Sequence, residues 1–488
     1  MTNAANQVKY RAAKSVKWAF LGDLLPKIFQ PLFTLILARL LTPSDYGIIG
    51  IATMVIGLAR MVESMGLSQA LIQTDEDIEE AANVVFWSNL GLSGLLYLII
   101  FLTSPFAADF FAEPRVTLVL RVMGLQLVLS AFDDVQEALL RRNFQFQQLV
   151  GRRLIPALTP ALVSIPLATA GFGYWSLVAG TLSGTALGVV LLWKVSDWRP
   201  RFRFDVKIAG LLLGFGAFVA IESLQGWALN YGDNLAAGYF LGIESLGYYN
   251  FGFTLAVIMI GYAISPLGSV AYSAFSRLKT DREELQRLFI DSTRMLAMVV
   301  FPLALGLALV TEPVISIVLG AKWLGAIPAI RILAIMPGLS WIIALNPQLY
   351  RALGHPDIMP KFHIATLIYI IPAYIIGAQF GLVAFCLSRA SVGFIFYIPH
   401  IWLSIKMLKL SRWYFWDCIR SPLFAGLIMS GVVFTMVSLL GPYNNNNWQE
   451  WGKLIIILTG GAISYSLMLW LIDRSLCLHA VQLMRKMI

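Results

Sequence analysis

The chain has 488 residues, of which 58% are hydrophobic and 13% are charged, and its mean hydropathy is +0.74. Soluble domains carry about a quarter of their residues as charged side chains, so this composition excludes a soluble globular protein. It predicts an all-α polytopic membrane protein. The net charge of +9 does not require a nucleic-acid partner, because basic residues collect on the cytoplasmic side of membrane proteins.

Apolar windows of about 20 residues predict fourteen transmembrane helices. The basic N-terminus leads into the first apolar run without an Ala-x-Ala-like cleavage site, so we expect the first helix to remain as a signal anchor. The predicted spans are 17–40, 47–72, 82–104, 116–138, 153–171, 174–194, 207–231, 246–270, 288–311, 324–349, 360–380, 382–405, 421–440 and 452–473.

The distribution of basic residues predicts that both termini are cytoplasmic. With the N-terminus inside, 27 of the 36 lysines and arginines fall on the inner side, in segments 9–17, 141–153, 194–207, 277–294, 351–361, 406–420 and 474–486. One inner loop, Thr74 to Glu80, is acidic instead. We expect it to be solvated, with pairing to the basic loops as the alternative.

Several ionisable residues lie within the predicted spans, where such residues normally face a cavity or a partner. Asp23 and Lys27 are four residues apart on the first helix, and Arg60 and Glu63 are three apart on the second. Either pair could instead be a local ion pair that neutralises itself. Glu222 lies near the middle of the seventh span.

Three further arginines lie on later helices. Arg121 and Arg331 are near the outer ends of the fourth and tenth spans, where they could also snorkel to the interface. Arg389 lies about two turns into the twelfth span, without an acid nearby on its own helix. The acids at the inner end of the fourth span are expected at the interface, where water can solvate them: Asp133, Asp134 and Glu137.

Other classes of site have no sequence support. The three cysteines and four histidines form no ligand cluster, and no GxxxxGK[ST] phosphate loop is present. We therefore expect neither a metal nor a cofactor, and no nucleotide hydrolysis by this chain.

A weak internal repeat divides the chain. A shift of 200 residues matches Leu41 to Leu241 and Gly47 to Gly247, a shift of 210 matches Arg121 to Arg331, and a shift of 208 matches Phe172 to Phe380 and Gly173 to Gly381. These matches predict two six-helix lobes, residues 1–206 and 207–410, followed by two additional helices and a cytoplasmic tail in residues 411–488. Parallel repeats of this kind place a central site between the halves.

Four stretches resemble one family: "LARLLTPSDYGIIG", "GLSQALIQ", "GFGYWSLVAG" and "WRPRFRFD". They are similar to Wzx-type lipopolysaccharide or exopolysaccharide flippases, in the polysaccharide-transporter branch of the multidrug/oligosaccharidyl-lipid/polysaccharide (MOP) exporter superfamily. The resemblance implies a two-lobe, non-enzymatic transporter of the bacterial inner membrane. It would move an undecaprenyl-diphosphate-linked oligosaccharide to the outer leaflet by alternating access. A polysaccharide polymerase and a chain-length regulator are candidate protein partners beside the membrane lipids.

An anionic diphosphate needs cations in a water-filled cavity, and guanidinium and ammonium groups bind phosphate well. We therefore predict substrate contacts from Lys27, Arg60 and Arg389, with Arg121 and Arg331 as further candidates. Acidic residues would weaken the positive electrostatic field of these cations or couple transport to H⁺ or Na⁺. The candidates are Asp23, Glu63 and Glu222.

Three alternatives remain open. A cation-coupled drug exporter of the MATE type would favour net-acidic cavity walls, whereas we expect bases at least to match acids. A membrane-embedded polymerase or glycosyltransferase would need larger loops than the predicted outer loops of about 10–15 residues. A scaffolding subunit of a polysaccharide-assembly complex would tolerate substitution of the cavity charges.

Overall fold

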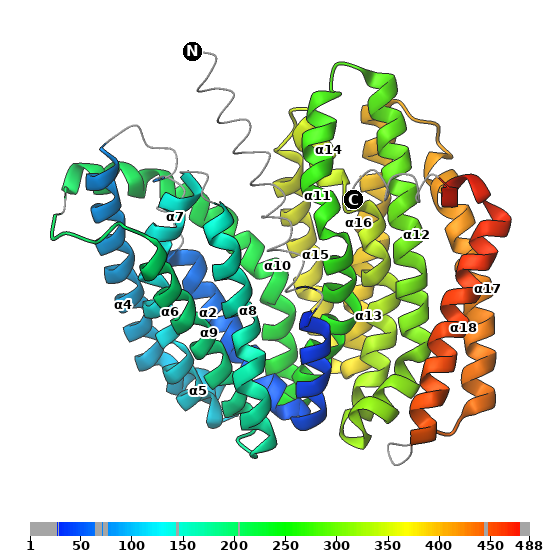
Figure 1. Cartoon of the computed structure of the whole chain (residues 1–488), viewed down its shortest axis with the longest axis horizontal. Coiled ribbons are helices and arrows are strands. Elements are labelled where there is room, and N and C mark those ends of the chain that lie inside the picture. Colours follow the sequence, from blue (N-terminus) through cyan, green and yellow to red (C-terminus); the bar gives the residue numbers. More distant parts are fainter. Residues whose placement is uncertain are drawn as a thin grey trace. The chain divides into compact units, whose positions relative to one another are not determined.

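The computed structural model describes residues 27, 29–63, 71, 77–142, 146–203, 205–443 and 448–478. Every regular element among these residues is helical (Figure 1). The chain forms two compact units, which are described separately here: unit 1, Met1–Gly247, and unit 2, Tyr248–Ile488. The lobe boundary predicted after residue 206 and the separate final segment from residue 411 remain predictions.

Unit 1 is a bundle of short-looped apolar helices. Its described elements are Phe29–Leu40, α2 (Pro43–Glu63), α4 (Ile78–Phe110), α5 (Arg115–Met123), α6 (Leu125–Ala131), α7 (Asp134–Arg142), α8 (Phe146–Thr169), α9 (Tyr174–Val195) and most of α10 (Val206–Phe253). At one end of α4, Asp77 accepts hydrogen bonds from the backbone of the first turn, and Glu79 forms an ion pair with Arg201 at 2.8 Å. Glu79, at the end of the acidic loop, therefore pairs with Arg201 of a basic segment, as the alternative prediction states.

Unit 2 contains the remaining helices. They are η1 (Thr254–Ile258), α11 (Met259–Arg277), α12 (Arg282–Val314), η2 (Ile315–Leu319), η3 (Ala321–Ala326), α13 (Ile327–Leu339), η4 (Ser340–Ile343), α14 (Asn346–Ala352), α15 (Ile358–Gln379), α16 (Leu382–Leu408), α17 (Tyr414–Leu440) and α18 (Trp448–Ile472). The last two helices, α17 and α18, pack against each other and against α12 (Figure 1).

The helices confirm the predicted fold class. Among the described residues, eleven helices are long and apolar enough to cross a membrane, and two shorter apolar helices, Phe29–Leu40 and Leu154–Thr169, accompany them. The helical hairpins predicted at 153–171/174–194 and 360–380/382–405 match α8/α9 and α15/α16 within a few residues at most ends. The total of fourteen spans remains a prediction.

The largest difference from the predicted spans is in α10. The spans predicted at 207–231 and 246–270 leave a connection between residues 231 and 246, which contains the polar sequence Gly232–Asp233–Asn234. The helix instead continues through it, and Asp233 is buried at 2% exposure. A single residue, Gly242, breaks the helix with φ of 82°, a conformation that favours glycine.

The weak sequence repeat has structural counterparts. Gly173 and Gly381 both have positive φ and directly precede the second helix of a hairpin, α9 and α16 respectively. Gly381 lies 208 residues beyond Gly173, so the same turn is built twice.

A second repeated pair forms a reciprocal contact inside unit 1, where the beginning of α2 packs on α10. A Cβ atom on Gly47 would lie 2.1 Å from the carbonyl oxygen of Ile243, and one on Gly247 would lie 1.9 Å from that of Pro43. Residues 43 and 47 are each 200 positions before residues 243 and 247, so the contact is pseudo-twofold. Only glycine permits this backbone approach.

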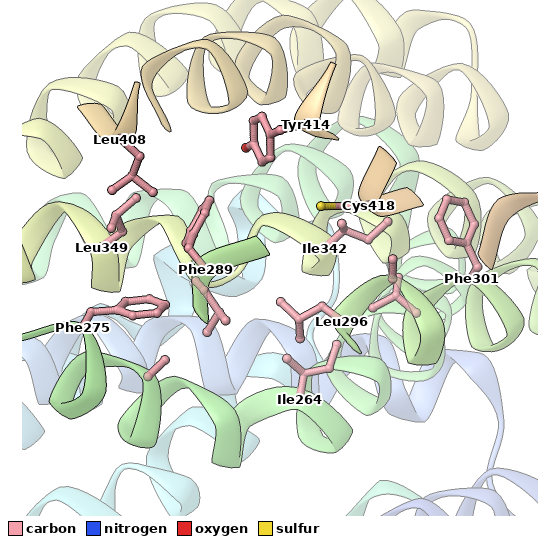
Figure 2. Packing of buried hydrophobic residues seen from close by; sticks show 14 of the residues in the cluster. Ile264, Phe275, Phe289, Leu296, Phe301, Ile342, Leu349, Leu408, Tyr414 and Cys418 are labelled. Carbon is pink, nitrogen blue, oxygen red and sulfur yellow. The ribbon is translucent and has the colours of Figure 1, made fainter. Parts of the chain in front are cut away.

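The core of unit 2 is apolar and aromatic (Figure 2). Phe275 of α11 packs on Phe289 of α12, with ring centroids 5.9 Å apart, and Tyr414 of α17 covers Phe289. The cluster extends to Leu349 of α14 and Leu408 of α16. Burial of these large side chains joins five helices into one body.

The glycine contact predicts a position-specific loss of stability. Gly47→Ala forces α2 away from α10 and should lower the unfolding temperature of the purified protein, since overpacking costs about 1–3 kcal/mol. The matched control is Gly91→Ala in α4, where an added Cβ meets nothing within 4 Å. Equal unfolding temperatures for the two variants would contradict the proposed close approach.

Candidate functional site

Asp45 ties together two of the sequence stretches that resemble the flippase family. One of its carboxylate oxygens accepts hydrogen bonds from the backbone N–H and the hydroxyl of Thr42, both at 2.8 Å. The other accepts from the backbone N–H of Tyr174, at the start of α9. An acid at a helix N-terminus satisfies otherwise unpaired donors, so Asp45 fixes the "TPSDYG" turn against the "GFGYW" turn.

An ion pair strengthens the same end of unit 1. Arg115 binds Glu113 through two nitrogens, at 2.7 and 2.8 Å, and donates to the hydroxyl of Ser44 at 3.1 Å. Its hydrogen bonds keep the pKa of Glu113 below its ordinary value. Arg115 therefore has a local structural role here and is not available to a ligand without breaking this pair.

A polar cavity of about 470 Å³ lies inside unit 1. Five helices and a connecting residue contribute its walls. They are α2 with Arg60; α6 with Gln126 and Ser130; Asp133, which precedes α7; α7 with Asp134 and Glu137; α8 with Pro156, Ala157 and Pro160; and α9 with Thr181, Gly184, Thr185 and Gly188. This is the cavity that we take as the candidate functional site.

The sequence of α8 and α9 explains one wall of the cavity. A Cβ on Gly180 would overlap the hydroxyl of Ser164, and one on Gly184 would lie 2.9 Å from the ring of Pro160. Small residues at four-residue spacing let α9 lie close against α8. Three prolines within α8 leave backbone carbonyls that neighbouring groups can satisfy, which is tolerated where a helix lines a polar space.

Arg60 and Glu63 direct their side chains to different helices. Arg60 donates from Nη2 to the hydroxyl of Ser130 in α6, at 3.4 Å. Glu63 is buried at 4% exposure and accepts a hydrogen bond from Ser93 of α4. The predicted alternative, in which the two residues neutralise each other locally, therefore does not describe their hydrogen bonds.

The sign of the cavity differs from our expectation. Its described lining contains one base, Arg60, and three acids, Asp133, Asp134 and Glu137. The sequence places these acids at the inner interface, where water can solvate them, but position along a single helix does not reveal which neighbours surround a residue. The expectation that bases at least match acids is therefore wrong for this cavity, and cavity charge taken alone favours a MATE-type exporter.

Two predicted arginines lie away from this cavity, and both bond to the preceding long helix. Arg121 of α5 donates to the hydroxyl of Ser104 at 3.1 Å and covers the ring of Phe101. Arg331 of α13 forms an ion pair with Glu312 of α12 at 2.9 Å, beside a second cavity of about 580 Å³ that α17 also lines.

Arg389 lies in unit 2 among aromatic side chains. Its guanidinium donates to the hydroxyl of Tyr374 at 3.2 Å and lies 5.4 Å from the ring centre of Phe253. Phe253 directly precedes η1, a single π-helical turn, and such turns occur frequently at functional sites. A further cavity of about 750 Å³ between α15 and α16 is lined by small, apolar and hydroxyl side chains.

The other predicted residues are only partly described. Lys27 is half-buried in a helical segment of unit 1. Asp23 and the side chain of Glu222 lie outside the described residues, although the backbone of Glu222 belongs to α10. Within the described part of the chain, no group of three or more His, Cys, Asp or Glu residues could hold a metal ion.

These features define a helical, multi-pass membrane protein with a polar cavity inside its first unit. The family described as "Polysaccharide biosynthesis protein" matches residues 36–328, more than half of the chain. The protein therefore belongs to this family.

Relatives and solved structures agree with this assignment. The chain is 26% identical to teichuronic acid biosynthesis protein TuaB of Bacillus subtilis, over 93% of this chain and 94% of that protein. It is 24% identical to succinoglycan biosynthesis transport protein ExoT of Rhizobium meliloti, over 92% and 91% of the two chains.

The fold is similar to that of two solved transporters. Lipid II flippase MurJ, in an inward closed conformation, superposes with a TM-score of 0.75 over 94% of this chain and 99% of MurJ, at 15% identity. An inward-facing multidrug resistance MATE family transporter of the MOP superfamily superposes with a TM-score of 0.61 over 80% and 99%, at 14% identity. The predicted MOP-type fold is thereby confirmed.

Two substitutions of Arg389 distinguish the contribution of its positive charge from that of its planar shape. Arg389→Lys keeps the positive charge but loses the planar guanidinium, whereas Arg389→Gln loses the charge. If the cation binds substrate, export should fall more in Arg389→Gln than in Arg389→Lys, with similar unfolding temperatures. Equal export by both variants, with equally lowered stability, would assign Arg389 to packing alone.

Proposed function

We propose that this protein is a flippase that moves an undecaprenyl-diphosphate-linked oligosaccharide from the inner to the outer leaflet of the bacterial inner membrane by alternating access. The product would enter lipopolysaccharide or exopolysaccharide biosynthesis. The observation that supports this most directly is Arg60 in the polar cavity of a membrane-spanning unit, in a chain that belongs to a polysaccharide biosynthesis family.

The chemistry of the cavity suits a strongly hydrated, charged cargo. A diphosphate that leaves water needs charge-assisted hydrogen bonds, which Arg60 can supply, and sugar hydroxyls need amide and hydroxyl partners such as Gln126 and Thr185. The three acids lower the affinity for an anion, which helps release. Lys27, Arg121, Arg331 and Arg389 remain candidate contacts outside this cavity.

Coupling and partners extend this proposal. Asp23, Glu63 and Glu222 are the residues that we proposed from the sequence for coupling to H⁺ or Na⁺. The polysaccharide polymerase and the chain-length regulator are the expected protein partners. The names of the relatives, one of them a transport protein, support translocation and not covalent catalysis as the activity.

The MATE-type drug exporter is the main alternative. The names of the two relatives quoted above refer to polysaccharide biosynthesis, and neither name refers to drug export. This family relationship, together with the greater structural similarity to MurJ, favours the flippase. The scaffolding alternative is separated from both by the following experiment.

Arg60→Ala should reduce surface polysaccharide roughly tenfold to a hundredfold, because a hydrogen bond to a charged group contributes about 1.5–3 kcal/mol. The measurement is polymer at the cell surface, normalised to the amount of protein in the membrane. The control is Arg287→Ala, which removes an exposed arginine paired with exposed Glu283. Normal polymer in Arg60→Ala would refute the role of this cavity and favour a scaffold.

The proposed orientation places the α8–α9 turn outside the cell. A cysteine introduced by Ala170→Cys, on an exposed residue of this turn, should react with an impermeant maleimide on intact cells. Lys279→Cys, in the exposed turn before α12, should react only after lysis. Both are made in a Cys477→Ser background. The opposite labelling pattern would reverse the topology.

A further inference from the structure

Two carboxylates beside the polar cavity, the buried Glu63 and the partly buried Asp134, are held on one face of α4. Glu63 of α2 accepts a hydrogen bond from Ser93, and Asp134 of α7 accepts one from the amide of Asn89 at 3.4 Å. Asn89 and Ser93 are four residues apart, so they occupy consecutive turns of the same helix face. Helix α4 therefore brings acids from two other helices to within about one turn of each other.

Asn89 supplies an independent observation. Its side chain is 1% exposed, and its amide nitrogen donates to Asp134, but its oxygen Oδ1 has no hydrogen-bond partner in the described structure. A buried acceptor without a donor destabilises the folded state, because the acceptor has lost its hydrogen bonds to water. The missing group is a hydroxyl or N–H donor at this point.

A proton on Asp134 would supply that donor once the Asn89 amide turns over, because at present its nitrogen, and not Oδ1, faces the carboxyl group. An ionised carboxylate only accepts hydrogen bonds, whereas a carboxylic acid also donates one, and an amide can do either. Half a turn of the Asn89 amide about its last side-chain bond points Oδ1 at the same carboxyl group. Asn89 can therefore donate to ionised Asp134 and accept from protonated Asp134.

Three carboxylates and one arginine lie around Asp134. Glu63 and Arg60 approach from α2, and Asp133 and Glu137 lie on either side of it in the chain. The guanidinium of Arg60 attracts an ionised Asp134, whereas the three carboxylates repel it. Repulsion among carboxylates that share a cavity is relieved when one of them is neutralised. Glu137 is paired with Arg141 one turn further along α7, and the described cavity-lining residues of α8 and α9 are uncharged.

We propose that Glu63, Asp134 and Asn89 form a proton-binding site in unit 1. A sodium ion would need several oxygen ligands around one point, but the described residues contain no group of three or more potential metal-binding side chains. A proton needs only one donor and one acceptor, which Asp134 and Asn89 provide. That this proton drives export rests on the proposed function, whereas its binding does not.

The site is tested first by infrared difference spectroscopy of the purified full-length protein, between neutral and mildly acidic pH. The wild type should gain a carbonyl band of a buried carboxylic acid. Asp134→Asn should lose this band, and Asn89→Leu, which removes the acceptor, should shift both its frequency and its pH midpoint. A band unchanged in both Asp134→Asn and Glu63→Gln would overturn the proposal.

The control for this spectrum is Asp357→Asn. The hydrogen bond from Lys361 keeps the pKa of Asp357 below its ordinary value, so this exposed carboxylate should stay ionised over the tested range. The band should therefore persist in Asp357→Asn. A spectral change produced by Na⁺ at constant pH, but not by acid, would also overturn the proposal. Thermal unfolding of each variant verifies that it is folded.

Transport measurements separate the two proposals. In vesicles that contain the protein, export by the wild type should respond to an imposed proton gradient, and export by Asp134→Asn should lose this response. If the carboxylic-acid band appears but no lipid-linked oligosaccharide moves, the flippase proposal is refuted and the proton-site proposal is retained. If the lipid-linked oligosaccharide moves but the band is absent, the proton-site proposal is refuted and the flippase proposal is retained.

Discussion

The cost of a charged side chain inside hydrocarbon constrains this entire structure. On insertion scales that cost is about 2.5–3.5 kcal/mol for an arginine or an aspartate at the centre of a helix. Four of the described intramembrane charges have a polar partner on another helix: Arg60 with Ser130, Glu63 with Ser93, Asp134 with Asn89, and Arg389 with Tyr374. The hydrogen bonds that make the charges tolerable also hold the helices together around polar space.

Close backbone packing leaves room for that space. Helix α9 lies against α8 through glycines, and α2 crosses α10 at Gly47 and Gly247, where an added Cβ would overlap a carbonyl oxygen. Asp45 then fixes the turn before α2 to the start of α9. One end of unit 1 is thus tightly joined, while the cavity between α2, α6, α7, α8 and α9 remains polar.

The helices and their class were predictable because apolar length and tight Gly-containing turns are local signals. The α8/α9 and α15/α16 hairpins follow from such signals, and so do the paired turns at Gly173 and Gly381. The connection predicted between residues 231 and 246 is wrong around Asp233, which is buried inside α10, whereas the break at Gly242 lies within the predicted interval.

The site was only partly predictable. Arg60 and Glu63 were selected because charges within an apolar span are costly, but their partners lie on helices far along the chain. The acids Asp133 and Asp134 were set aside as interfacial, because only the packing of α7 against α4 shows that Asn89 contacts Asp134. Tertiary neighbours, which sequence spacing along one helix does not encode, decide which charges share a cavity.

The most direct measurement is flipping by the purified protein in proteoliposomes that carry a fluorescent undecaprenyl-diphosphate oligosaccharide. Protection of the glycan from an enzyme added outside reports which leaflet it occupies. Our account predicts rapid exchange between leaflets with the wild-type protein and strongly reduced exchange with Arg60→Ala, at equal reconstituted amounts. Exchange no faster than in protein-free liposomes, or the same rate for both proteins, would contradict it.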